Sequence, residues 1–487
     1  MKEIEIIDTS WRDANASQWG EKMDTAMMYK IAPVMDRAGY KAMDATSVSH
    51  FEYAVRYLHE NPWERMRILS RIVRSTTLSF MMLGNTLHLF KLTPGPIMGL
   101  WMQHLAKVGI GRVTLMECSN DMENMAAGVR YAQNAGLEAI AAVIYSHSPF
   151  HTDEYYEEKT RDAVKIRPDA VYLKDPGGLL TPERTKTLVP VMQKNLGGLP
   201  LEIHSHCTTG LAPLCYLEAM KLGVKTFHTA ISPLANGPSQ PSTETLLRNA
   251  RILGYGSRVD EKALEEIADH FRAVAKKEGF PIGTPVEYSL FQYEHQVPGG
   301  VISNVKRQLK DIKFEHRLDE ILEDAVLVRK ELGYPIMVTP FSQFVCTQAS
   351  LNVIQGERYK TITDEVIMCA LGIYGKPPAP IDPNVLDRIH SLPRTKELVN
   401  WTPKEISLED MRRDLGSGYS EEELLLMVLC SEEDLKGMKN AGPINTEYSR
   451  NVNPMARLIK EISKQKKPAF IHIQRENFSL SLRRETP

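Results

Sequence analysis

The chain has 487 residues, of which 43% are hydrophobic and 25% are charged, a composition typical of a water-soluble globular protein with more than one domain. Its 59 Lys and Arg residues almost balance its 61 Asp and Glu residues, and the net charge of −2 excludes a general electrostatic attraction to nucleic acid. No apolar run reaches the ~18 residues of a membrane span, and six cysteines without a CxxC pair predict reduced thiols and a cytoplasmic location.

Short β-rich apolar runs alternate with amphipathic runs through the first 300 residues. The predicted strands are residues 3–8, 40–46, 76–83, 111–117, 137–145, 169–174, 200–206 and 224–230. The helices predicted between them include Met28–Ala38, Pro96–Val108, Met122–Ala135, Pro182–Leu196 and Leu211–Leu222, each followed by a glycine within two residues. Eight strands that alternate with helices predict a (β/α)₈ TIM barrel over residues 1–300. An open doubly wound sheet is the alternative, but eight evenly spaced strands favour the closed barrel.

Beyond residue 300 the apolar spacing becomes helical and strand-like runs become scarce. We therefore expect a mostly helical C-terminal domain over residues 301–465, with a proline-rich linker at Lys376–Pro383. Residues 466–487 are expected to form a tail that contains a strand-like run at Ala469–Gln474.

Four residues with metal-binding or catalytic side chains lie where predicted strands end: Asp8, Lys174, His204 and His206. Loops at the carboxyl ends of the strands build the active site of a TIM barrel. Alternation along a strand points both histidines to one side, where their imidazoles can share one divalent cation. The competing interpretation is a pair of histidines that hydrogen-bond to the backbone.

Around these residues the chain resembles the metal-dependent carboxyltransferases, a family that includes the carboxyltransferase domain of pyruvate carboxylase, the α subunit of oxaloacetate decarboxylase and the metal-binding subunit of transcarboxylase. The resemblance runs from Asp8 to about Leu429. Its landmarks, in chain order, are Asp8-Thr-Ser-Trp-Arg-Asp13, Asn61-Pro-Trp-Glu-Arg65, Leu173-Lys-Asp175, Gly178-Leu-Leu-Thr-Pro182, Gly210-Leu-Ala-Pro213, Ser239-Gln-Pro241, Val297-Pro-Gly-Gly300 and Gly356-Glu-Arg-Tyr-Lys360. A more distant similarity joins the opening motif and the His-x-His pair to metal-dependent aldol-type lyases.

The resemblance implies a Zn, Mn or Co ion held by Asp8, His204, His206 and a carbamylated Lys174. The ion would act as a Lewis acid that stabilises an enolate. Arg12 and Asp13, together with Lys174, are the candidate catalytic residues, and an unmodified Lys174 is expected to pair with Asp175 or Asp13. The family also implies a keto-acid or acyl substrate, carboxybiotin on a separate carrier protein, and a homodimer.

The chain departs from the family pattern at four positions of the expected substrate pocket. A substrate-contacting glutamine is replaced by Ala16, and an arginine that binds the substrate carboxylate is replaced by Leu83. A proton-shuttling threonine is replaced by Pro238, and Glu117 stands where an aspartate is usual. Loss of the arginine removes a charge-assisted clamp, which predicts that pyruvate is not the preferred substrate.

The sequence is therefore compatible with three functions. The first is a divergent carboxyltransferase subunit that acts on an acceptor other than pyruvate. The second is a biotin-independent metal-dependent decarboxylase or aldol-type lyase on the same barrel. The third is a non-catalytic homologue, although the retained metal-binding residues argue against it.

Overall fold

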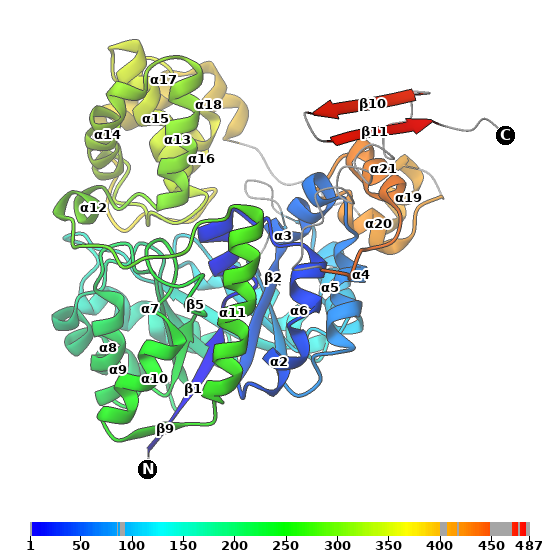
Figure 1. Cartoon of the computed structure of the whole chain (residues 1–487). Coiled ribbons are helices and arrows are strands. Elements are labelled where there is room, and N and C mark those ends of the chain that lie inside the picture. The colour runs from blue at the N-terminus through cyan, green and yellow to red at the C-terminus, as the bar shows by residue number, and fades with distance from the viewer. Residues whose placement is uncertain are drawn as a thin grey trace.

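A computed structural model describes residues 2–84, 86–87, 93–399, 407–415, 418–448, 470–475 and 478–483. Eight parallel strands form a closed barrel, confirming the predicted (β/α)₈ architecture and ruling out the open sheet (Figure 1). The strands are β1 (Lys2–Asp8), β2 (Ala42–Ser47), β3 (Thr77–Leu83), β4 (Arg112–Met116), β5 (Glu138–Ile144), β6 (Ala170–Asp175), β7 (Leu201–Ser205) and β8 (Thr226–Thr229).

Strand β1 closes the barrel because it pairs with both β2 and β8. Ile7 is in register with Ala42 on one side and with His228 on the other. A short ninth strand, β9 (Tyr255–Ser257), pairs with the start of β1. Strands such as β5 are buried along almost their whole length, as expected for parallel strands covered by helices outside and packed side chains inside.

Helices surround the barrel, and many begin at a side-chain cap. In α8 the Thr181 side chain accepts a hydrogen bond from the backbone N–H of Arg184, and Pro182 occupies the first turn. The predicted helix 28–38 is two short helices, with Pro33 in the first turn of the second. The elements on the barrel are α1 (Thr25–Tyr29), α2 (Ala32–Arg37), α3 (Val48–Tyr53), α4 (Pro62–Ser70), α5 (Gly95–Lys107), α6 (Met122–Asn134), α7 (Asp153–Lys165), α8 (Pro182–Asn195), α9 (Ala212–Lys221), α10 (Thr243–Ile252) and α11 (Glu261–Glu278), with single π-helical turns η1 (Asn15–Trp19) and η2 (Ala54–Leu58).

A second group of helices covers the carboxyl end of the strands (Figure 1). Met116 and Ile144 from the barrel belong to the same buried apolar cluster as Phe344 of α15. The group comprises α12 (Leu290–His295), α13 (Gly299–Asp311), η3 (Glu315–Arg317), α14 (Leu318–Glu331), α15 (Phe341–Gln355), α16 (Asp364–Ala370), α17 (Pro383–Ser391) and α18 (Pro393–Leu398). The boundary predicted at residue 300 falls inside α13.

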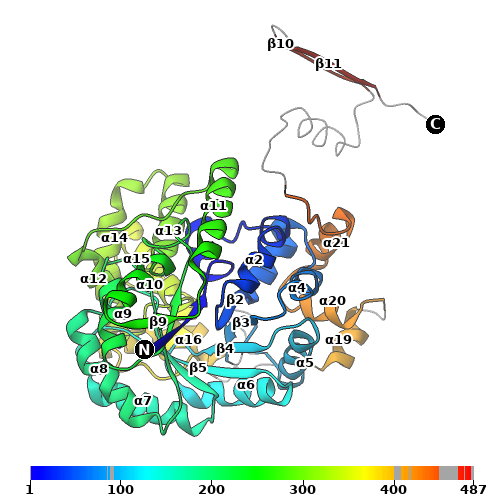
Figure 2. The same cartoon turned by 60° about the horizontal axis from the view of Figure 1, so that its bottom comes forward.

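A third group, α19 (Leu408–Leu415), α20 (Glu421–Leu426) and α21 (Glu432–Ala441), lies on the flank of the barrel beside α4 and α5 (Figure 2). The Trp63 indole donates a hydrogen bond to the Glu422 carbonyl, and Leu425 and Leu426 belong to the barrel's own apolar core. The segment predicted as one helical domain, 301–465, therefore contains helices with two different packing partners. In the tail, β10 (Phe470–Arg475) and β11 (Phe478–Arg483) form an antiparallel hairpin, and β10 overlaps the predicted strand-like run.

Two expectations from composition can be compared with the structure. None of the helices in the described ranges is both long and apolar enough to cross a membrane. All six cysteines are buried free thiols, as the absence of paired cysteine motifs predicted.

Candidate metal centre

Three polar side chains converge at the carboxyl end of the barrel strands. His204 lies in β7, His206 follows that strand directly, and Asp13 stands in the turn after β1. Their nearest nitrogen and oxygen atoms all lie within 4.8 Å of one another, and all three side chains are buried. The fourth member, Lys174 of β6, is paired in register with His204. Burial and convergence together mark this group as the candidate site.

The distances within the group are those of ligands around a single point. His204 Nε2 lies 3.3 Å from His206 Nε2, and the Asp13 carboxylate lies 3.3 Å from the first nitrogen and 3.4 Å from the second. A tetrahedral zinc ion with nitrogen ligands at about 2.0–2.1 Å holds those ligands roughly 3.3–3.4 Å apart. The donor set therefore fits a small divalent cation.

The electrostatic setting also favours the ligating forms of these groups. Burial, with Lys174 nearby, lowers the pKa of His204 well below its usual value, so the ring is neutral. Burial alone would raise the pKa of Asp13, but Arg12, His206 and Lys174 outweigh it and hold that pKa well below its usual value. A neutral imidazole and an ionised carboxylate are the forms that bind metals.

Asp8, expected from the sequence as the carboxylate ligand, does not lie in this group. It is fully buried, and its two oxygens accept hydrogen bonds from the Ser10 backbone N–H at 3.1 Å and the Ser10 hydroxyl at 2.7 Å. The carboxylate thus closes a local turn at the end of β1, a common use of aspartate. Burial raises the pKa of Asp8 to about 7. The chain then turns and brings Asp13, five residues later, to the histidines.

The predicted catalytic residue Arg12 holds Asp13 in place. Its Nη1 lies 3.0 Å from the Asp13 carboxylate, while Nε donates to Asp44 at 2.7 Å and Nη2 also contacts Asp44. Because several of its nitrogens already face carboxylates and the side chain is buried, Arg12 is committed to these two aspartates.

Lys174 pairs with Asp13, one of the two partners expected for an unmodified lysine, at an Nζ–Oδ2 distance of 3.5 Å. The other candidate, Asp175, accepts hydrogen bonds from the backbone N–H groups of Leu179 and Leu180 and from the Ser205 hydroxyl. Burial lowers the pKa of Lys174. Its carbamylation stays a prediction.

The four predicted pocket residues have different surroundings. Ala16 is half-buried in η1, and Leu83, at the end of β3, packs against the apolar cluster shared with the covering helices. Glu117 accepts hydrogen bonds from Ser119 and Asp121 in its own loop, and burial raises its pKa to about 7. Pro238 contributes its carbonyl oxygen, which accepts a hydrogen bond from His206 Nδ1 at 2.6 Å. That bond holds a proton on Nδ1 and directs Nε2 at the other members of the group.

Sequence reasoning missed Gln240, although it belongs to the Ser-Gln-Pro landmark. Its amide oxygen accepts a hydrogen bond from the Thr9 hydroxyl at 2.7 Å, and this contact turns the amide nitrogen to within 3.2 Å of His206 Nε2. Reasoning from the sequence also missed His228, which lies on the inward face of β8 beside His204. The only sequence signal for His228 was the alternation of inward-facing and outward-facing residues along its strand.

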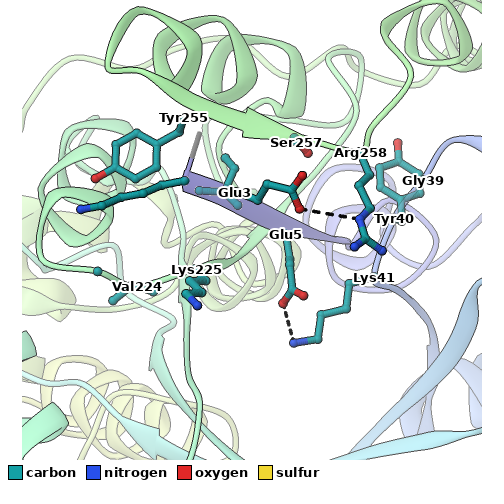
Figure 3. A pocket seen from close by; sticks show the side chains of 13 residues that line it. Glu3, Glu5, Gly39, Tyr40, Lys41, Val224, Lys225, Tyr255, Ser257 and Arg258 are labelled. Atoms are coloured by element: carbon teal, nitrogen blue, oxygen red, sulfur yellow. Dashed lines mark hydrogen bonds and ion pairs between the residues drawn. The ribbon is translucent and has the colours of Figure 1, made fainter.

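A hollow of about 880 Å³ lies at the opposite, amino-terminal end of the barrel (Figure 3). Several of its charged side chains face each other in pairs: Lys41 lies 2.8 Å from Glu5, and Arg258 lies 3.7 Å from Glu3. TIM-barrel chemistry takes place at the carboxyl end of the strands, and these pairs neutralise one another. The hollow therefore does not compete with the Asp13–His204–His206 group as the candidate site.

Comparison with known proteins finds relatives among carboxylases. Residues 293–479 match the family model of a conserved carboxylase domain. A pyruvate carboxylase subunit of Methanocaldococcus jannaschii is 36% identical over 456 residues, which cover 91% of this chain and 80% of that protein. The 2-oxoglutarate carboxylase large subunit of Hydrogenobacter thermophilus is 30% identical over 447 residues, covering 88% and 67% of the two chains.

The fold has a counterpart among solved structures. The carboxyl transferase domain of Rhizobium etli pyruvate carboxylase, solved with oxamate and biotin, superposes with a TM-score of 0.83. The match covers 91% of this chain and 79% of that one at 22% sequence identity, a level at which the likeness shows the shared fold.

Proposed function

The chain belongs to the carboxyltransferase family that includes the pyruvate carboxylase subunit of M. jannaschii, and from this membership we propose that it transfers a carboxyl group between biotin on a separate carrier protein and an acceptor other than pyruvate. Its relatives are carboxylases, so the enzyme's reaction class is carboxyl transfer. The observation that carries the proposal is the convergence of Asp13, His204 and His206 at the carboxyl end of the barrel.

In this proposal Asp13, His204 and His206 hold one divalent ion, and Lys174, once carbamylated, is the fourth ligand. Carbamylation would replace an ammonium group by a carboxylate-like anion, which suits a divalent cation. A bound ion would supply Lewis-acid polarisation of a substrate carbonyl oxygen. Arg12 fixes the Asp13 carboxylate, and the Pro238 carbonyl fixes the His206 ring.

The substrate class follows from side chains that the chain lacks. Leu83 and Ala16 offer no charge-assisted hydrogen bond to a carboxylate, and Arg12 is already occupied by Asp13 and Asp44. Leu83 also extends the apolar cluster at the end of β3. We infer that the acceptor is a partly apolar 2-keto or β-keto acid. It would be larger than pyruvate and less charged than 2-oxoglutarate, which are the substrates named for the relatives.

Metal analysis tests the proposed centre directly. Wild-type protein should carry about one divalent ion per chain, and His204→Ala and His206→Ala should each lose most of it. His104→Ala is the matched control, because His104 is equally buried but lies on α5 outside the barrel interior. Full metal content in both site variants would show that the convergence does not form a metal centre.

Turnover with biotin tests the reaction and the acceptor. Oxaloacetate decarboxylation in the presence of free biotin should be slow, whereas a carboxylated product of a larger keto acid should be decarboxylated faster. A rate with oxaloacetate that exceeds the rate with every larger analogue would contradict the proposed acceptor. Turnover that does not depend on biotin would instead identify a metal-dependent lyase. The expected homo-oligomeric state and cytoplasmic location stay predictions.

A further inference from the structure

Three buried side chains form a line inside the barrel that ends at the candidate metal centre. Glu202 and His204 lie two residues apart on β7, so both point to the barrel interior, and His228 lies on the adjacent strand β8. His228 Nε2 lies 3.2 Å from the Glu202 carboxylate, and His228 Nδ1 lies 3.4 Å from His204 Nδ1. The remaining nitrogen, His204 Nε2, faces Asp13 and His206.

At the end of this line away from the candidate metal centre, two cations lie beside the Glu202 carboxylate. Arg112 Nη2 lies 2.5 Å from Glu202 Oε2, and Lys41 Nζ lies 3.6 Å from the other carboxylate oxygen. Arginine carries its charge under all ordinary conditions and has only donors. The Glu202 carboxylate between these two cations therefore acts as an acceptor toward His228.

The direction of the remaining hydrogen bonds follows from this acceptor. His228 donates its Nε2 proton to Glu202, so its Nδ1 is bare and accepts a proton donated by His204 Nδ1. With its proton on Nδ1, His204 has a bare Nε2, the atom that a metal ion would bind. Without a metal, the Asp13 carboxylate, 3.3 Å from Nε2, competes with His228 for the same proton. The His228 ring is held in this orientation because it stacks on Tyr172, with ring centres 5.3 Å apart and an angle of 7° between the planes.

We propose that Glu202 and His228 are positioning residues that select the Nδ1-protonated tautomer of His204 and so present its Nε2 to the metal. This inference rests on the proposed metal centre. His206 reaches the same state by a different route, through the Pro238 carbonyl. A second partner of this kind typically changes metal affinity by about 10–100-fold.

The experiment compares wild type with His228→Phe, a change that keeps an aromatic ring against Tyr172 and removes both nitrogens. Two measurements are made: the ¹⁵N chemical shifts of His204 in metal-free protein labelled with [¹⁵N]histidine, and the dissociation constant for Zn²⁺ by chelator competition. The share of His204 that is protonated on Nδ1 should be larger in wild type than in His228→Phe, where the acceptor for that proton is gone. Zn²⁺ should bind His228→Phe about 10–100-fold more weakly with the same final stoichiometry.

Two further variants separate positioning from general damage. His104→Phe, the same substitution at a buried histidine on α5, should leave both measurements unchanged. His228→Gln, whose amide has one donor and one acceptor group, should restore part of the affinity.

Failure of this inference is distinguishable from failure of the metal centre. Unchanged His204 shifts or unchanged Zn²⁺ affinity in His228→Phe would overturn the positioning role. If wild type binds no Zn²⁺ but His204 shows the tautomer change, the positioning role holds and the metal centre is wrong.

Discussion

The two ends of the barrel interior both contain buried charged groups, but they are arranged differently. At the amino-terminal end the buried Arg112 guanidinium faces the buried Glu202 carboxylate. At the carboxyl end the nitrogens of His204 and His206 and the oxygens of Asp13 point at one shared location. Convergence of acceptor atoms, and not burial, is therefore what distinguishes a ligand site from a structural ion-pair network.

The strongest test of this contrast compares the two aspartates near the mouth. Asp13→Asn should weaken divalent metal binding by at least about 100-fold, more than the loss of an outer partner would, because a ligand charge is removed. Asp8→Asn should keep about one ion per chain, since the Asp8 carboxylate hydrogen-bonds only Ser10 among the described contacts. Elemental analysis after dialysis checks both. Metal loss in Asp8→Asn alone would reinstate Asp8 as the ligand.

Breaking the buried ion pair between Arg112 and Glu202 should lower the stability of the protein. Arg112→Met leaves the buried Glu202 carboxylate with the His228 hydrogen bond and the more distant Lys41. Removal of one partner of a buried ion pair costs about 3–5 kcal/mol of the free energy of unfolding. Chemical denaturation measures the change. The matched control is Arg394→Met, whose partner Asp364 is about half exposed, and there the cost should stay within about 1 kcal/mol. Equal losses of stability in Arg112→Met and Arg394→Met would contradict the distinction between the buried ion pair and the exposed one.

The pH dependence of stability should reveal the titration of the buried Asp8 carboxyl group. Burial raises the pKa of Asp8 to about 7 in the folded protein, whereas an unfolded aspartate titrates near pH 4. Between about pH 4 and 7 the folded state binds more protons, so stability falls as pH rises through this window and levels off above it.

Asp8→Asn removes the titrating carboxyl group and with it this pH-dependent loss of stability. Its melting temperature relative to wild type should rise from pH 5 to pH 8 by the equivalent of about 3 kcal/mol, because about two pH units of the window lie above pH 5. Thermal unfolding of metal-free protein at a series of pH values measures the difference. A constant offset between the two proteins would show that the carboxyl group does not titrate in this window.

The smallest expected effect concerns Leu83, an apolar side chain at the carboxyl end of the barrel strands. Leu83→Arg adds a cation at the end of β3 and should improve binding of small keto acids by about tenfold, roughly 1.4 kcal/mol. It should weaken the binding of the larger acceptor. Leu83→Met, which conserves volume and polarity, is the control and should change neither. Titration of wild type and both variants with each ligand measures these affinities. Unchanged affinities in Leu83→Arg would mean that residue 83 does not contact the substrate.

Sequence patterns determined much of this protein because they are local. Alternation along β7 placed His204 and His206 on one side, and eight apolar runs with helices between them predicted the barrel. The end of β6 likewise placed Lys174 at the mouth. These inferences need only the period of a strand and the rule that parallel strands end at the same face.

Only the tertiary structure decided which aspartate joins the histidines and what lies behind them. The turn after β1 folds Asp8 onto Ser10 and brings Asp13 to the mouth, and a turn of that kind leaves no periodic signal. Glu202 meets Arg112 and His228 across distant parts of the chain. Such contacts depend on strand register around the closed barrel and on long-range charge pairing, because local sequence specifies the direction of a side chain but not the partner that it meets.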